Sequence, residues 1–198
     1  MSFYIDFTIG KLEASLTPWV SYDIDPTTIA PKDLGSKNID EFDYTLDFGY
    51  PVGNLSINAG AIYYDVTNAP ETTEVYGSLS YEAEIGKLLS LSPGVKFYYD
   101  IKEIKKAYLE ASLSLGTPLF SYVSLNSILG YDFGQFALED ENGVSVAESK
   151  PTTLQLGISA DYEITKGVTI SPSFVYVLGL HNGINDSKFA VLKFGFEF

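Results

Sequence analysis

The residues of this chain that could do chemistry are mainly carboxylates, and many of them stand two positions apart in polar stripes. Glu74, Glu82 and Glu84 share one stripe, and Asp161 and Glu163 share another. Side chains two positions apart point to the same face of a β-strand, so this spacing gathers carboxylates on one face of a sheet. A surface lined with acids concentrates cations and repels anions. The chemistry that the spacing predicts is electrostatic selection of solutes.

The polar face of the predicted sheet carries far more acids than bases. Its bases are Lys11, Lys96 and Lys193, and Glu197 adds an acid near the C-terminus. Two arrangements fit these charges: an open, acid-lined lumen, or a filled interior in which acids pair with Lys and Tyr or lie at the rims in water. The residues predicted to line the interior are Glu13, Asp43, Asp47, Glu74, Glu82, Glu84, Lys96, Asp100, Glu110, Asp132, Asp161 and Glu163.

The residues needed for catalysis or metal binding are few. His181 is the single His; it could act as a base with Asp186, but hydrolases of this kind need further positioned acids or a Ser nucleophile, and no such motif is visible. The acids of segments 23–25 and 139–142 could offer oxygens to calcium, but neither has EF-hand spacing. We therefore predict an exposed loop His, no catalytic residue, no metal site, no cofactor and no enzymatic activity.

Length and composition narrow the class of protein. The 198 residues suit a single domain, 1–198. With 12 Lys, no Arg, 26 Asp plus Glu and a net charge of −14, the chain is a poor nucleic-acid binder. The absence of Cys excludes disulfides and thiol chemistry. No stretch approaches about 18 uninterrupted apolar residues, so the sequence predicts no transmembrane helix.

Nearly the whole sequence alternates with a period of two, which predicts β-strands rather than helices. Short connections alternate with longer ones, such as 165–167 and 134–151, and this favours an antiparallel up-and-down sheet. An eleventh strand, 3–9, would form a hairpin through Gly10 and Lys11, and we interpret it as an extension or plug. Twelve strands are possible if one is missing at the N-terminus. The ten strong strands are about 11–24, 41–51, 54–66, 72–85, 91–101, 107–115, 119–133, 152–164, 168–180 and 187–198.

A weak internal repeat places a proline early in three strands. Leu16–Val20, Leu91–Val95 and Ile170–Phe174 share the pattern, with Pro18, Pro93 and Pro172 at the centre of each. A proline within a closed sheet removes a ladder hydrogen bond, so we expect each near the rim, at a bulge.

Alternation does not by itself decide whether the apolar face meets lipid or a protein core. The polar face is rich in Ser, Gly, Asn, Thr and Tyr, whereas the outside of a soluble barrel would carry many Lys and Glu. Most strands reach the 9–11 residues that a tilted strand needs to cross a bilayer. Aromatics gather at the ends of apolar faces: Phe42, Tyr44, Phe48, Tyr50, Phe97, Tyr99, Tyr131 and Phe133. These features favour a membrane barrel, with a soluble ligand-binding barrel as the alternative.

The C-terminal residues alternate up to a terminal aromatic, with Ala190 and Leu192 leading to Phe194, Phe196 and Phe198. This end resembles the C-terminal strand of Gram-negative outer-membrane β-barrel proteins, and segments Leu55–Asp65 and Glu74–Gly77 are similar to small porin-like members. The resemblance implies an all-β transmembrane barrel of the bacterial outer membrane, with short periplasmic turns and longer extracellular loops. It also implies that the three Phe residues signal to the barrel-assembly machinery, and that outer-membrane lipids and lipopolysaccharide are partners.

The function expected from these features is a narrow, acid-lined passive channel for small neutral or cationic solutes. The main alternative is a non-conducting structural or adhesin-like barrel that makes contacts through loops 25–40 and 134–151. In the second loop, 136–138 and 144–146 predict a hairpin that extends beyond the sheet. A barrel enzyme is the least favoured interpretation.

Overall fold

The computed structural model describes residues 5–22, 39–67, 69–86, 88–117, 123–134, 138–139, 145–146, 149–181 and 184–196, and this part of the chain is all β. The strands are β1 (Ile5–Ile9), β2 (Leu12–Tyr22), β3 (Ile39–Val52), β4 (Leu55–Val66), β5 (Thr72–Tyr81), β6 (Ala83–Ile85), β7 (Leu89–Asp100), β8 (Ala107–Thr117), β9 (Val123–Phe133), β10 (Leu138–Glu139), β11 (Ser145–Val146), β12 (Ser149–Ala160), β13 (Tyr162–Thr165), β14 (Val168–Gly179) and β15 (Ser187–Phe196).

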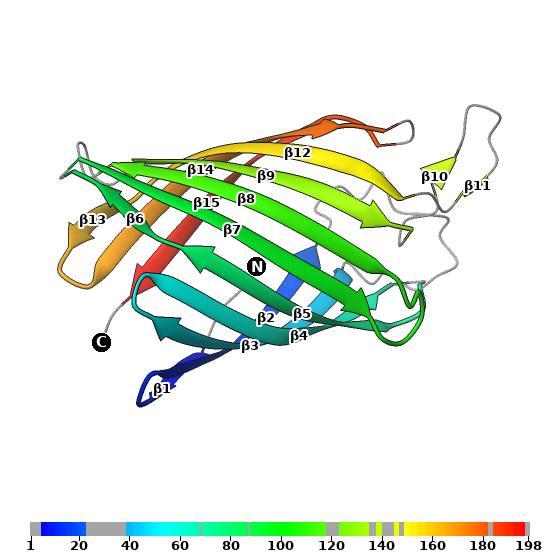
Figure 1. Ribbon diagram of the computed structural model, residues 1–198. Helices are drawn as coiled ribbons and strands as arrows, with labels where there is room; N and C mark the ends of the chain where they lie inside the picture. The colour runs from blue at the N-terminus through cyan, green and yellow to red at the C-terminus, as the bar shows by residue number, and fades with distance from the viewer. Residues whose placement is uncertain are drawn as a thin grey trace.

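Thirteen of these strands form one antiparallel sheet in which strands consecutive along the chain are neighbours (Figure 1). Because β6 continues β5 and β13 continues β12, the chain crosses this sheet eleven times. The predicted all-β, antiparallel up-and-down architecture is confirmed. The predicted hairpin of the first strand through Gly10 and Lys11 is confirmed, since β1 pairs with β2 from Ile5↔Leu16 to Ile9↔Leu12. In this structure β1 is a strand of the sheet rather than an extension or plug. Gly10, with φ of +65°, makes this tight hairpin possible.

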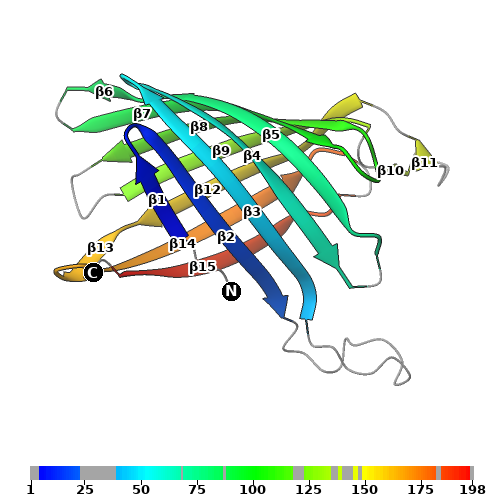
Figure 2. The ribbon, with the colours of Figure 1, turned by 90° about the horizontal axis from the view of Figure 1, so that it is seen from below.

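The sheet curls strongly but does not close into a barrel. Among the described residues, β15 pairs only with β14, and β1 pairs only with β2. The curl brings β2, β3 and β4 opposite β12, β14 and β15 across an interior, as two perpendicular views show (Figures 1 and 2). The expected closed barrel is therefore an open, curled sheet in this structure.

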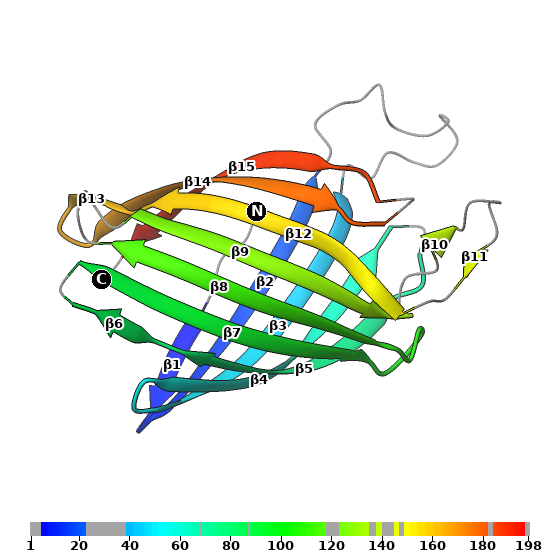
Figure 3. The ribbon, with the colours of Figure 1, turned by 45° about the horizontal axis from the view of Figure 1, so that its top comes forward.

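The two ends of the sheet differ in their connections. One end, here called the turn end, carries the tight turns that join β3 to β4 and β13 to β14 (Figure 3). These turns contain Gly53 and Gly167, whose φ angles of +63° and +77° suit glycine. The opposite, loop end carries the longer connections 67–71 and 101–106. The predicted hairpin in loop 134–151 is present at this end, where β10 pairs with β11 through Leu138↔Val146 and Glu139↔Ser145. Loop 25–40 lies almost entirely outside the described residues.

The repeated prolines lie inside strands, and the expectation of rim bulges was wrong for them. Pro93 on β7 lies opposite the break between β5 and β6, and Pro172 on β14 lies opposite the break between β12 and β13. The pairing register is the same on both sides of each of these two breaks, so the ladder is interrupted rather than bulged. Proline has no N–H to donate, which explains why the pairing stops beside it. Pro18 pairs with Tyr44 without any register shift on that side.

The two faces of the sheet differ in polarity and exposure. On β5, Glu74 and Tyr76 are buried on the concave side. Val75, which lies between them, and Leu79, further along the strand, are exposed on the convex side. In the described part of the chain only Ala14 and Tyr76 are buried hydrophobic residues, so the protein has no conventional apolar core. Its large apolar side chains instead cover the outside of the curl; Phe97 on β7 is 46% exposed.

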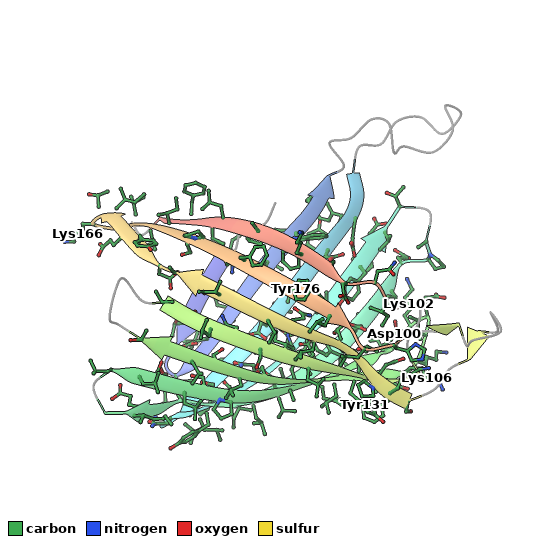
Figure 4. The ribbon with its side chains drawn as sticks, turned by 90° about the horizontal axis from the view of Figure 1, so that it is seen from above. Asp100, Lys102, Lys106, Tyr131, Lys166 and Tyr176 are labelled. Atoms are coloured by element: carbon green, nitrogen blue, oxygen red, sulfur yellow. The ribbon has the colours of Figure 1, made fainter. Side chains whose placement is uncertain are left out.

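Asp100 closes the loop that follows β7. Its Oδ1 accepts the backbone N–H groups of Lys102 (2.9 Å) and Glu103 (2.9 Å), and its Oδ2 accepts the Thr72 hydroxyl (2.6 Å). The side chain is fully buried, at 0% exposure. It therefore connects loop 101–106 to the first residue of β5. Asp100, Lys102 and Lys106 lie together at the loop end, while Lys166 lies at the opposite end (Figure 4).

A second contact joins the neighbouring loops. The Lys102 Nζ donates to Glu71 Oε1 at 2.8 Å, and the Tyr63 hydroxyl donates to the other oxygen of Glu71. The hydrogen bond from Lys102, with help from Tyr63, holds the pKa of Glu71 below its usual value. Because both groups are largely exposed, this pair adds little to stability.

We expect Asp100→Ala to lower the free energy of unfolding by about 1–3 kcal/mol, because buried N–H donors of the loop would lose their acceptor. Asp100→Asn keeps one acceptor oxygen and should lose less. Equilibrium urea unfolding of the refolded protein measures the difference, with the exposed Asp65→Ala as the control. Equal stability of Asp100→Ala and Asp65→Ala would contradict this role.

Candidate functional site

The candidate site is the polar concave face of the sheet, and it has two parts. Acids, tyrosines and one lysine occupy the part formed by β3 to β8. Hydroxyl and amide side chains line much of the part formed by β9 to β15, and they also occur in the first part, where Asn58 donates to Ser78. Cross-strand pairing places the interior side chains in rows that run across many strands and pass through both parts. One such row is Ser15, Asp47, Gly60, Tyr76, Tyr98, Tyr108, Asp132 and Lys150.

In the first part, tyrosine hydroxyls donate to carboxylates on other strands. Tyr64 on β4 donates to Glu74 on β5 at 2.8 Å, and Tyr98 on β7 donates to Glu110 on β8 at 2.9 Å. A third tyrosine, Tyr76 on β5, passes over β4 and donates to a carboxylate on β3, that of Asp47. Each bond satisfies a partly buried carboxylate.

Gly60 makes the reach of Tyr76 possible. A Cβ atom on Gly60 would lie 2.5 Å from the Tyr76 hydroxyl oxygen and would also collide with the backbone carbonyl of Leu46. The same arrangement recurs on the other side of the row, where Tyr108 lies over Gly130 towards Thr152, with 3.5 Å between the two hydroxyl oxygens. Glycine is required at Gly60 and Gly130 because a tyrosine crosses the strand there.

Lys96 is the cation of this part. Its Nζ lies 3.7 Å from the ring centroid of Tyr76 and 4.8 Å from that of Tyr98, which is cation–π geometry. Lys96 is on β7 and stands opposite Glu110 on β8. The rings of Tyr76 and Tyr98 are 5.7 Å apart, so the lysine is held by two neighbouring tyrosines. We call Asp47, Glu74, Tyr76, Lys96, Tyr98 and Glu110 the tyrosine–carboxylate cluster.

The structure brings together some of the predicted lining residues and separates others. Asp47, Glu74, Lys96 and Glu110 belong to the cluster. Asp43 lies beside it on β3, and Asp132, at 0% exposure, stands opposite Tyr108 on the next strand.

The remaining predicted lining residues lie at the ends of the sheet. Glu13 faces Gly49 near the turn end, Asp100 closes a loop, and the others are exposed towards the turn end: Glu82, Glu84, Asp161 and Glu163. Of the predicted assembly signal, Phe194 is exposed on the convex face and Phe196 ends β15. Phe198 and Glu197 lie outside the described residues.

The second part contains a cavity of about 420 Å³, which we call the hydroxyl cavity. Ser124 and Ser159 share a 2.7 Å hydrogen bond in its wall. The cavity is lined mainly by β9, β12, β14 and β15, and most of its polar lining consists of Ser, Asn and Gln. Its lining residues are Ser124, Asn126, Ile128, Gln155, Gly157, Ile158, Ser159, Asp161, Ser171, Ser173, Val175 and Lys193.

The structure does not show the His181–Asp186 arrangement considered from the sequence. His181 Nε2 lies 2.6 Å from Lys150 Nζ. Asp186 instead accepts the Tyr176 hydroxyl (3.0 Å) and the Gly179 N–H (3.0 Å). Among the described residues no group of three or more His, Asp or Glu side chains could hold a metal ion.

The tyrosines of the cluster are residues to which the sequence assigned no site. Their signal was present, because Tyr64, Tyr76, Tyr98 and Tyr108 occupy the same alternate positions as the acids. The sequence could not predict the hydrogen-bond partner of each hydroxyl. Tyr76 on β5, for example, reaches over β4 to bond Asp47 on β3.

No protein-family model matches the sequence, and no curated protein matches it either. Within the described residues, no helix is long and apolar enough to cross a membrane.

We expect Gly60→Ala to lower the free energy of unfolding by about 1–3 kcal/mol, because the added methyl group collides with backbone as well as with Tyr76. Gly77→Ala is the matched control, since a Cβ there meets nothing closer than 3.9 Å. Urea unfolding of both variants measures the difference. A Gly60→Ala protein as stable as Gly77→Ala would show that Tyr76 does not lie over β4.

Proposed function

We propose that this chain is an outer-membrane β-barrel protein of the porin-like kind, acting as a narrow, acid-lined passive channel for small neutral or cationic solutes. The observation that carries the proposal is the direction of the curl. The apolar face is outside and uncovered, and the polar face is inside. A water-soluble barrel has the opposite arrangement.

The outer face has the chemistry of a surface in contact with lipid. Every long strand carries at least one exposed large apolar side chain, and a broad exposed apolar face marks a site of contact with a membrane or a protein partner. Aromatic rings pack together on this face, as with Phe97 and Phe133 (6.5 Å) and Tyr44 and Tyr63 (6.4 Å). Both pairs lie nearer the loop end, where membrane barrels carry one of their aromatic girdles. Hydrocarbon would solvate this face at no cost.

A bilayer also requires the sheet to close, because lipid cannot satisfy the backbone groups of a free edge. With eleven antiparallel crossings, β15 runs in the same direction as β1 and in the opposite direction to β2. A fully antiparallel barrel therefore closes by pairing β15 with β2. That barrel has ten crossings, and β1 leaves the edge of β2 when it forms.

The interior favours cations over anions. The tyrosine–carboxylate cluster holds three acids around the single ammonium of Lys96, which leaves it net negative. The hydroxyl cavity offers a polar route for uncharged solutes beside it. We propose no enzymatic activity and no cofactor, because the chemistry of both parts is that of binding and selection.

A specific observation favours the second candidate, a non-conducting barrel. The rings of Tyr76, Tyr98 and Tyr108 form a continuous row, with centroids 5.7 Å and 6.1 Å apart, across the concave face of β5, β7 and β8. If the row closes the lumen, the hairpin of β10 and β11 becomes the functional surface. Recording of ion conductance in a planar bilayer distinguishes the two candidates.

We expect discrete conductance steps in a planar bilayer, with a reversal potential under a KCl gradient that favours K⁺. Glu74→Gln combined with Glu110→Gln should lower the ratio of K⁺ to Cl⁻ permeability on the order of twofold, because two lumen charges are removed. Glu103→Gln, in an exposed loop, is the control and should leave the ratio unchanged. Insertion without any steps would contradict the channel and support the non-conducting barrel.

We expect closure between β2 and β15 to be detectable by disulfide cross-linking, because the native chain has no Cys to interfere. Cysteines at Ser15 or Thr17 should form a disulfide with one at Val191 or Lys193 in lipid vesicles, since paired strands bring Cβ atoms within about 4.5 Å. Thr17→Cys with Ser173→Cys, one strand further away, is the control. A disulfide between Asp6→Cys and Lys193→Cys would instead show closure through β1.

A further inference from the structure

The geometry points to the hydroxyl cavity as a binding site for small zwitterionic solutes that carry one ammonium and one carboxylate group. This inference rests on the proposed function and names a solute class for it. A zwitterion has no net charge, so it belongs to the neutral solutes that the channel is proposed to pass.

Two opposite charges stand in one row of the cavity with a hydroxyl between them. Ser171 on β14 pairs with Lys193 on β15. On its other side, the pairs Ser159↔Ser173 and Tyr162↔Ile170 place Asp161 opposite Ser171. The row Asp161, Ser171, Lys193 thus crosses three neighbouring strands on the concave face.

The spacing separates the two charges by about the size of a small ligand. Neighbouring strands are about 4.8 Å apart, so the backbones at Asp161 and Lys193 are roughly 10 Å apart. In the part of the chain that the structure describes, no hydrogen bond or ion pair engages the side chains of Asp161, Ser171 or Lys193. Both charged side chains line the cavity and are exposed to it.

The break in the ladder exposes Asp161. Asp161 belongs to neither β12 nor β13, because the pairing with β14 is interrupted beside Pro172. The carboxylate therefore stands at a point where the sheet is locally open. The prolines repeat, but only this break lies beside the cavity.

The remaining lining suits a polar ligand of modest size. Around the row stand the hydroxyl and amide groups of Ser124, Ser159, Asn126 and Gln155, which both donate and accept hydrogen bonds. No aromatic ring is among the lining residues. The volume of about 420 Å³ lies within the range of known small-molecule sites.

Charge selects the zwitterion among polar ligands. An anion would meet the carboxylate of Asp161 and the overall negative charge of the protein, and a simple cation would leave Lys193 without a counter-charge. A ligand with both charges pairs each side chain with its opposite. The cation of the tyrosine–carboxylate cluster, by contrast, is held by tyrosines of the chain itself.

The test uses β-alanine as the probe and the full chain refolded in detergent micelles. Isothermal titration calorimetry should show binding of β-alanine, with propionate and propylamine at least about tenfold weaker, because each lacks one of the two charges. Asp161→Asn and Lys193→Met should each weaken β-alanine binding about tenfold. Lys193→Arg should preserve it, since the charge remains.

The matched control is Lys188→Met, which removes a lysine on the same strand that does not line the cavity. Circular dichroism and urea unfolding identify any variant that fails to fold, and Lys193→Arg supplies a charge-preserving version of the test. Wild-type binding that is unchanged by Asp161→Asn and Lys193→Met, or equal binding of the singly charged analogues, would overturn the inference.

A second measurement separates this inference from the proposed channel. Conductance steps without calorimetric binding of β-alanine would overturn the zwitterion site and leave the channel standing. Binding without conductance would support the site and contradict the channel. With both present, β-alanine should reduce the current through the wild type but not through Lys193→Met.

Discussion

The alternation of apolar and polar residues, in a sheet that curls with its polar face inward, is the constraint on which the rest of the structure depends. It removes the usual source of stability, since the large apolar side chains cover the outside rather than a core. It gathers carboxylates, hydroxyls and lysines on a confined concave face. These interior groups then need partners, and the tyrosines supply them: Tyr64 and Tyr98 each donate to a carboxylate on a neighbouring strand. In our account the same constraint assigns the surroundings, with lipid outside and solute inside.

The interior is divided by the identity of the residues in each cross-strand row. Where the row contains tyrosines, rings and carboxylates fill the space and hold Lys96 between two rings. Where the rows contain Ser, Gly and Asn, a cavity remains. The prolines that interrupt two ladders, Pro93 and Pro172, add local openings to an otherwise regular sheet. In the proposed channel, selection by charge and admission of polar solutes would belong to different parts of one interior.

Much of this fold could be predicted from the sequence, because strand position and facing both follow from a period of two. The bounds of β4 and β14 and the facing of Glu74 and Glu110 are examples. The bond from Tyr76 to Asp47 could not be predicted, since it depends on crossing Gly60, a diagonal contact that alternation does not encode. The interruption of pairing beside Pro172 could not be predicted either, because locating it requires the pairing register of β12, β13 and β14. The free edges of β1 and β15 could not be predicted, because periodicity locates strands but does not show which strands pair. Asp100 had the predicted facing, but its role in closing a loop depends on backbone N–H groups brought together by the fold.

The most direct test of the account compares lipid contact on the two faces. Trp19, the single tryptophan, stands opposite Asp43 on the concave face, while Phe97 is on the convex face. In vesicles whose acyl chains carry bromine, the fluorescence of the native protein should be quenched little. That of a Trp19→Phe, Phe97→Trp variant should be quenched strongly. Strong quenching of Trp19 together with weak quenching of the tryptophan introduced by Phe97→Trp would contradict a polar interior and an apolar exterior in the membrane.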